Sequence, residues 1–192
     1  MSVSAVILSK RPVSRLIPGV TVVPFVSEFS CARGLLQARL ESIKRVQTDS
    51  FFFLDDDDEL PADYLRVLEL CEAVDTPLAY TDELITGQRL TPFVRRSAPY
   101  SEDAFIEDPT LIHHLAVCKT DAALRASAVV PRGLFMFENL LWFQVAKEGA
   151  TYVPEVGYIW NRSATGLSRD PSILTSLVQS STWAYRHREE AT

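Results

Sequence analysis

The chain has 192 residues, 47% of them hydrophobic and 23% charged, which is typical of one globular domain with a full core. Its formal net charge of −6 argues against a nucleic-acid footprint over the whole surface. The longest apolar runs are strand-sized, and the N-terminus lacks a basic region followed by an apolar one. We therefore expect neither a membrane-spanning helix nor a signal peptide.

The first half of the chain alternates strand-like and helix-like patterns. Helical periodicity predicts one helix from Arg33 to about Val46, with Leu36, Leu40 and Ile43 on one face and Arg39 off that face. A second helix is predicted from Pro61 to about Ala73. Short apolar runs predict strands at 3–8, 20–26, 51–54 and 78–81. This order is typical of βαβ units and a largely parallel sheet.

The second half is irregular up to about residue 108. A strand is then predicted at 115–118, a helix at 138–148, and closing strands at 152–154 and 156–160. Asp170 and Pro171 form an N-cap and N1 pair, which predicts a last helix from about 171. Since no repeat or linker interrupts the pattern, we expect a single α/β domain over 1–192.

The three cysteines, Cys31, Cys71 and Cys118, are widely spaced and odd in number. This pattern fits neither a disulfide framework nor a zinc site. It predicts buried, reduced thiols and a cytoplasmic location.

Four aspartates, Asp55 to Asp58, directly follow the apolar run 51–54. In an open α/β sheet, ligands bind at the carboxyl ends of the strands. Because carboxylates two apart in an extended segment point the same way, we expect Asp55 and Asp57 to converge on one ligand. Carboxylate oxygens together with substrate phosphates suit Mg²⁺ or Mn²⁺. The alternative interpretation is a solvated acidic turn that caps the next helix.

With its neighbours, the acidic run resembles the DxD region of family 2 glycosyltransferases. Those enzymes often carry Ala-Arg-Asn, a helix, and a strand that ends in Leu-Asp-x-Asp-Asp; this chain has Ala32-Arg33-Gly34, a predicted helix, and Leu54-Asp55-Asp56-Asp57-Asp58. Further matches follow in the family's order, from about residue 3 to about 170. They are Pro61, Tyr64-Leu65, Phe137-Glu138-Asn139-Leu140, Glu148-Gly149-Ala150, Tyr152-Val153-Pro154 and Tyr158-Ile159-Trp160-Asn161-Arg162.

The resemblance implies a GT-A (Rossmann-like) domain with a mostly parallel central sheet flanked by helices. It implies a metal-dependent glycosyltransferase that uses Mn²⁺ or Mg²⁺ and a nucleotide-diphosphate sugar donor, with inversion at the anomeric carbon. Asp57 would bind the metal, and Asp55 would contact the ribose or the metal. Arg33 would lie near the nucleotide phosphates, and Glu138 would be the general base that deprotonates the acceptor hydroxyl.

Two positions depart from the family pattern. Glu28 stands where an acidic phrase usually follows the second strand, and we expect it to take part in donor binding. Asn139 replaces the usual second acid of the family's Glu-Asp pair. The base is then Glu138, or a carboxylate elsewhere such as Glu107 or Asp108, or the chain is a relative without activity.

Arg162 and Arg169 belong to a polar segment between the last strand and the last helix. Such a segment can close over a diphosphate, with either arginine as a clamp, or it is a plain surface loop. His113 and His114 are adjacent in a predicted strand, so we expect them to face opposite sides and not to share an ion.

Two other functions compete with sugar transfer. The first is a phosphohydrolase with Asp55 as nucleophile and Asp57 as acid, although Glu59 stands where such sites carry Thr or Val. The second is a GT-A-like binding module without turnover. The acceptor is left open among a saccharide, a lipid-linked glycan, a protein and a modified nucleic-acid base.

Overall fold

The computed structural model describes residues 2–9, 12–26, 32–87, 91–131, 137–162 and 172–188. Within these ranges the strands form one sheet in the order β2 (Thr21–Val26), β1 (Val3–Ser9), β3 (Ser50–Asp55), β6 (Ala116–Lys119), β4 (Leu78–Thr86) and β5 (Phe93–Arg95). Strands β6 and β5 pair with successive parts of one side of β4, and β7 (Ala150–Asn161) pairs with the other side. Strands β2, β1 and β3 pair in parallel, as do β4 and β7, whereas β6 and β5 are antiparallel to their neighbours. The expected mostly parallel α/β sheet is confirmed.

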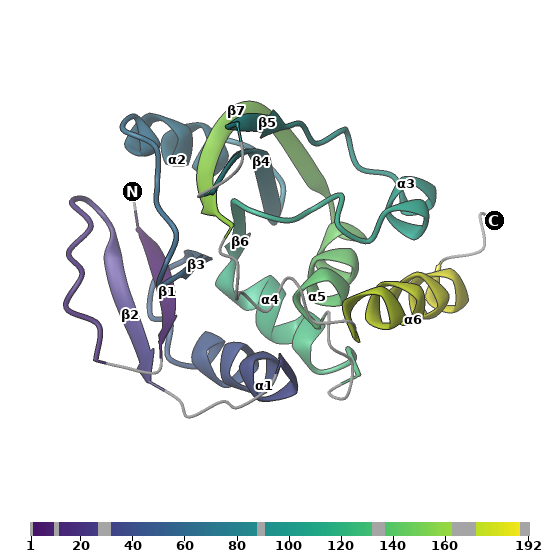
Figure 1. Ribbon diagram of the computed structural model, residues 1–192. Coiled ribbons are helices and arrows are strands. Elements are labelled where there is room, and N and C mark those ends of the chain that lie inside the picture. The colour runs from purple at the N-terminus through teal and green to yellow at the C-terminus, as the bar shows by residue number, and fades with distance from the viewer. Residues whose placement is uncertain are drawn as a thin grey trace.

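The described helices are α1 (Ala32–Ile43), α2 (Tyr64–Glu72), α3 (Glu102–Glu107), α4 (Thr120–Ser127), α5 (Phe137–Ala146) and α6 (Ser172–His187). Figure 1 shows α1, α4 and α5 gathered on one side of the sheet, with α6 beside α5 and α2 on the other side. Helix α3 packs against α6. The sheet is therefore covered on both faces, as a buried parallel sheet requires.

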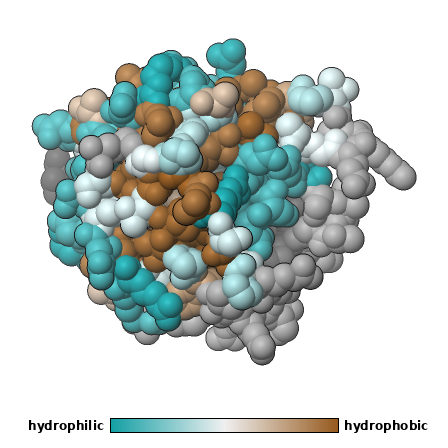
Figure 2. All heavy atoms as spheres, turned by 90° about the vertical axis from the view of Figure 1, so that its left-hand side faces the viewer, coloured by the Kyte–Doolittle hydropathy of each residue, from teal (hydrophilic) through white to brown (hydrophobic). Residues whose placement is uncertain are grey.

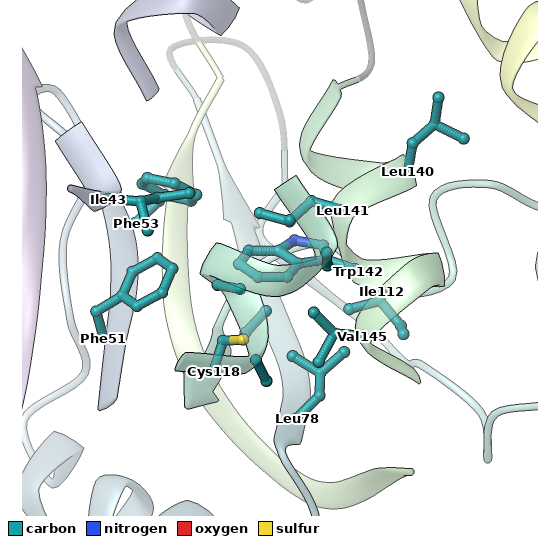
Figure 3. Packing of buried hydrophobic residues seen from close by; sticks show 14 of the residues in the cluster. Ile43, Phe51, Phe53, Leu78, Ile112, Cys118, Leu140, Leu141, Trp142 and Val145 are labelled. Atoms are coloured by element: carbon teal, nitrogen blue, oxygen red, sulfur yellow. The ribbon is translucent and has the colours of Figure 1, made fainter. Parts of the chain in front are cut away.

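The side chains of β1 and β3 alternate between two cores. Successive residues of a strand point to opposite faces, so a continuous apolar strand contributes side chains to both cores. The core toward α1, α4 and α5 contains Val6, Leu8, Phe51, Phe53 and Trp142, and the core toward α2 contains Ala5, Ile7, Phe52, Leu54, Val67 and Leu68. Figure 3 shows Trp142 of α5 directed toward Phe51 and Phe53 of β3, with ring centroids 6.3 and 5.9 Å apart.

Strand β7 is continuous, although two strands were predicted there. Its register against β4 shifts on both sides of Asp82, so Pro154 falls in the irregular stretch where no ladder hydrogen bond is needed. Gly157 faces Thr81 so closely that a Cβ on it would meet Thr81 Oγ1 at 2.5 Å. The bulge brings Tyr158 and Asn161 to the end of β3.

Three elements were not predicted: β5, α3 and α4. Strand β4 is also longer than predicted, because it continues through Asp82 and Glu83 to Thr86. Both acidic side chains are buried there, at 4% and 2% exposure. Their hydrogen-bond partners come from other parts of the chain, so the local pattern could not show that a strand tolerates them.

The prediction of buried, free thiols is confirmed for Cys71 and Cys118, whereas Cys31 lies outside the described residues. Burial raises the pKa of the Cys71 thiol to about 12. Of the described helices, none is long and apolar enough to cross a membrane. Figure 2 shows apolar side chains gathered on the face of the molecule that lies on the left of Figure 1, where β2 is the edge strand.

Candidate active site at the ends of β1 and β3

The acidic run lies where two parallel strands end side by side. Leu8 of β1 pairs with Asp55, the last residue of β3. Ser9, the next residue of β1, donates its hydroxyl to Asp56 Oδ2 at 2.7 Å. This is the edge of the sheet at which open α/β folds bind their ligands.

The aspartates form a turn and not the extended segment that was expected. Asp56 and Asp57 occupy the turn, and the backbone N–H of Asp58 donates to the carbonyl of Asp55 at 3.2 Å. Strand alternation therefore does not orient Asp55 and Asp57, and this part of the prediction is wrong.

Asp58 anchors the turn to β7. Its carboxylate, 2% exposed, accepts hydrogen bonds from the Tyr158 hydroxyl at 2.8 Å and from the Asn161 N–H at 2.7 Å. Its carbonyl accepts from Arg15 Nη1 at 2.7 Å. Burial, together with the charge of Asp55, raises the pKa of Asp58 to about 7. The fourth aspartate thus positions the loop and does not face a ligand.

Asp57 and Asp56 are exposed at the tip of the turn, and Asp55 is partly exposed. Partial burial and the charges of Asp55 and Asp56 raise the pKa of Asp57. No ion pair to Asp57 or Asp56 occurs within the described ranges. The carboxylates of Asp56 and Asp57, which carry no ion pair among the described residues, supply oxygen donors of the kind that suits Mg²⁺ or Mn²⁺.

Arg39 links the end of β3 to the start of α5. It is 4% exposed, donates from Nη2 to Asp55 Oδ1 at 2.5 Å, and pairs through Nη1 with Glu138. Sequence reasoning placed Arg39 off the buried face of its helix, and that placement is wrong. One signal was available, because Arg39 and Ile43 are four residues apart and so share a helix face.

A pocket adjoins this ion-paired group. Trp142 and Phe53 form its apolar wall, and Arg39, Glu138, His113 and His114 supply its polar groups; Ala116 completes the lining. Glu138 has a side-chain exposure of 15%. Arg39 thus connects the lining of the pocket to Asp55 at the start of the acidic turn.

The two histidines lie in the loop before β6 and not in a strand, so the expectation that they face opposite sides is wrong. Their ring centroids are 3.9 Å apart. The His114 ring stacks on Tyr158 with centroids 4.3 Å apart, and burial lowers the pKa of His114 well below its usual value. His113 Nδ1 lies 3.0 Å from Glu83 Oε2.

Glu83 is fixed from two sides. Arg95 Nη1 donates to its Oε1 at 3.0 Å, and His113 occupies its other oxygen. Arg95 is held in turn by Thr110, whose carbonyl and hydroxyl accept at 2.7 and 2.6 Å. Although burial alone would raise it, the hydrogen bond and charge of His113, with the charge of Arg95, lower the pKa of Glu83 to about 2. Glu83 is therefore ionised at neutral pH.

Among the described residues, two groups bring three metal-ligand atoms within 4.8 Å of one another: Glu83 with His113 and His114, and Asp55 with Asp58 and His114. In each group one carboxylate already has both oxygens hydrogen-bonded, those of Glu83 and Asp58. We therefore assign neither group as a metal site.

Asn139, which replaces the family's usual acid, is fully buried beside the pocket wall. Its side-chain amide donates to the carbonyl of Pro109 at 2.5 Å and so ties α5 to the loop before β6. A carboxylate could not donate this hydrogen bond. Residue 139 is thus a structural position in this chain.

Of the remaining predicted site residues, the structure describes the side chains of Arg162, Glu107 and Asp108. Arg162 follows Asn161 at the end of β7, is exposed, and places its guanidinium carbon 5.6 Å from the Trp160 ring centroid. Arg33 belongs to the first turn of α1, but its side chain lies outside what the structure describes. Glu28 and Arg169 lie outside the described residues altogether. Glu107 ends α3, and the next residue, Asp108, is 3.7 Å from Arg95.

No family model and no curated protein matches the chain. Among solved structures, S. aureus TarS 1–349 aligns with a TM-score of 0.64 at 12% identity, over 99% of this chain and 67% of that chain. A longer TarS structure gives 0.66 at 11% identity, over 99% of this chain and 40% of that chain. TarS 1–349 in complex with UDP-GlcNAc gives 0.60 at 12% identity, with coverage of 99% and 68%. The likeness is one of fold.

Proposed function

Since the chain has the GT-A fold of TarS, a family 2-like glycosyltransferase, we propose that it transfers a sugar from a nucleotide-diphosphate donor to a hydroxyl acceptor. The observation that carries the proposal is the group of carboxylates formed by Asp55, Asp56 and Asp57 at the joint end of β1 and β3, which Arg39 connects to a pocket. TarS, on the same fold, has been solved with UDP and with UDP-GlcNAc.

Asp57 and Asp55 would hold Mn²⁺ or Mg²⁺, and Asp56 stays hydrogen-bonded to Ser9. When bound, the ion neutralises the charge that develops on the departing diphosphate. The chain's own part is to fix the turn: Asp58 ties it to β7, and Arg39 orients Asp55. Arg162 directly follows Asn161, whose N–H donates to Asp58, and would contact the diphosphate, with Arg33, Glu28 and Arg169 as further donor-binding candidates.

Glu138 lies at the pocket end of this arrangement, where the acceptor would bind. Its carboxylate pairs with the buried Arg39. If Glu138 took up a proton, the Arg39 guanidinium would lose a counter-charge. Losing one charge of a buried ion pair is costly in free energy. The pairing supports a role of Glu138 in holding Arg39 and the acceptor more than a role as base. The direct test is the Glu138→Gln rate.

The proposal is tested by incubating the protein with a panel of nucleotide sugars, with Mn²⁺ or with EDTA, and measuring released nucleoside diphosphate. Slow metal-dependent release to water, accelerated by an acceptor, is the expected result. The Asp57→Asn variant should lose it, whereas Asp75→Asn, an exposed aspartate between α2 and β4, should not.

Two results would favour the alternatives. Release of inorganic phosphate from p-nitrophenyl phosphate, with no nucleotide-sugar turnover, indicates a phosphohydrolase. Metal-dependent nucleotide binding without any turnover indicates a binding module.

Inversion is checked by the anomeric configuration of the product sugar.

A further inference from the structure

We propose that His113, oriented by the buried Glu83, is the general base that takes the proton from the acceptor hydroxyl. The inference rests on the proposed function and supplies the base that Asn139 leaves missing. His113 would be the catalytic residue, and Glu83 a positioning residue that acts through it.

The hydrogen bond between the two side chains fixes which ring nitrogen carries the proton. Glu83 is 2% exposed, and an ionised carboxylate only accepts, so the His113 Nδ1 at 3.0 Å must donate. In the neutral imidazole, Nε2 is then the nitrogen with the free lone pair. A carboxylate in this position also stabilises the imidazolium that forms when Nε2 accepts a proton.

The Glu83 carboxylate cannot turn away from the histidine, because Arg95 Nη1 holds its other oxygen at 3.0 Å and Thr110 holds Arg95. Within the described residues, by contrast, no group hydrogen-bonds Nε2 of His113. The His113 side chain has 18% exposure and lines the pocket together with Glu138 and Arg39. One ring nitrogen is thus committed to the protein and the other is left for a ligand.

The pocket offers no equally suitable base among its described residues. His114 is enclosed by Tyr158 and His113, and its burial opposes protonation. Glu138 is committed to Arg39. Asn139 has no basic atom and donates to Pro109.

His113 also lies at a suitable place relative to the donor carboxylates. His114 has a nitrogen within 4.8 Å of a carboxylate oxygen of Asp55, and one within 4.8 Å of a ring nitrogen of His113. His114 therefore links His113 to Asp55 at the start of the acidic turn.

Several charged and titratable groups surround the His113 ring. Glu83 comes from β4, Arg95 from β5, and His114 from the same loop, while Arg39 and Glu138 share the pocket. The Trp160 ring of β7 lies edge-on with centroids 5.5 Å apart.

The proposed step balances without a further reactant. The acceptor oxygen forms a bond to the anomeric carbon, and its proton passes to His113 Nε2. The bond between the anomeric carbon and the diphosphate oxygen breaks, and its electron pair leaves on the diphosphate. With water as acceptor, the same step gives free sugar.

The experiment compares the wild type, His113→Gln, Glu83→Gln and the control His187→Gln, with the nucleotide sugar that the wild type turns over and with water as acceptor. His187 is the exposed histidine at the end of α6. We expect His113→Gln to lower kcat about 100-fold or more with unchanged nucleotide-diphosphate affinity. It should also remove the acidic limb of the pH–kcat profile, which a merely structural role would not do. Glu83→Gln should lower kcat less, and His187→Gln should match the wild type.

A His113→Gln variant that keeps kcat within threefold of the wild type, or keeps the acidic limb, overturns the inference while the proposed function stands. A wild type that turns over no nucleotide sugar overturns both. Urea unfolding midpoints show whether each variant is folded; if Glu83→Gln is not, the more exposed His113→Gln decides the question alone.

Discussion

Arg39, from the middle of α1, donates a 2.5 Å hydrogen bond to Asp55, the last residue of β3. A buried cation thus sits between the proposed donor carboxylates and the pocket, since its second nitrogen pairs with Glu138. This contact ties the stability of the fold to the geometry of the site.

Replacing Arg39 with methionine should therefore affect both properties. Two carboxylates would lose their partner, one of them largely buried, and we expect the free energy of unfolding to fall by about 3 kcal/mol. Urea denaturation measures this loss. Arg125→Met removes an arginine whose pairs with Asp121 and Glu148 are exposed, and should leave the midpoint nearly unchanged. Equal midpoints for the two variants would contradict the role given to Arg39.

The pKa of Asp58 predicts a pH dependence of stability. The folded state keeps the Asp58 proton up to about pH 7, whereas the unfolded chain loses it near its ordinary pKa of 3.8. The contribution of Asp58 is therefore complete below about pH 4 and is lost as the pH rises toward about 7.

Asp58→Asn removes this titration and keeps the shape of the side chain. From pH 4 to pH 7, the urea midpoint of Asp58→Asn should rise relative to that of the wild type. The difference in midpoint between Asp75→Asn and the wild type should stay constant over this range. A constant difference between Asp58→Asn and the wild type across this range would show that Asp58 is not protonated in the folded state.

Asn139→Asp restores the acid that the family resemblance leads one to expect. In this structure the new carboxylate would face the carbonyl of Pro109 in place of a donating amide. We expect a loss of about 1–3 kcal/mol in the free energy of unfolding and no gain in sugar transfer. Nucleotide-sugar turnover, measured with the unfolding midpoint, checks both. An increase in kcat would show that residue 139 reaches the reacting atoms.

Gly157→Ala tests the bulge that brings β7 to the acidic turn. Its Cβ would meet Thr81 Oγ1 at 2.5 Å and Thr81 Cβ at 3.1 Å, so we expect a loss of about 1–3 kcal/mol in stability. In a Thr81→Ala background the same change should cost less, because the closest atom is gone. Thermal unfolding of the four proteins in this cycle measures the coupling. Additive losses would mean that β7 and β4 are not in the described register.

Strands and helices could be predicted from the sequence where the apolar pattern within a single element was enough to identify it. The run Phe51–Leu54 is apolar on both faces, and β3 is accordingly covered by helices on both sides. The position of the aspartates after it was likewise predictable. Their turn was not, because it depends on Tyr158 and Asn161, about one hundred residues away.

Three of the side chains that the sequence pattern misplaced, those of Asp82, Glu83 and Arg39, are buried charges whose partners come from distant elements. Asp82 accepts from the Ser97 N–H at 2.9 Å and from the Tyr152 hydroxyl at 2.6 Å, and Glu83 accepts from Arg95. A local window treats such residues as solvated, so it ended β4 before Asp82. The same reasoning left Arg39 on the outside of α1. The partners of these buried charges are set by tertiary contacts, although for Arg39 its four-residue spacing from Ile43 indicated the buried face.

The most direct test of the account is the affinity of UDP and other nucleoside diphosphates for the wild type and for Asp57→Asn, by calorimetry with and without Mn²⁺. We predict that Mn²⁺ strengthens nucleotide binding to the wild type at least tenfold, and that Asp57→Asn abolishes this gain while its unfolding midpoint stays close to that of the wild type. Nucleotide binding that is absent, or that responds to Mn²⁺ equally in both proteins, would contradict a donor site at the end of β3.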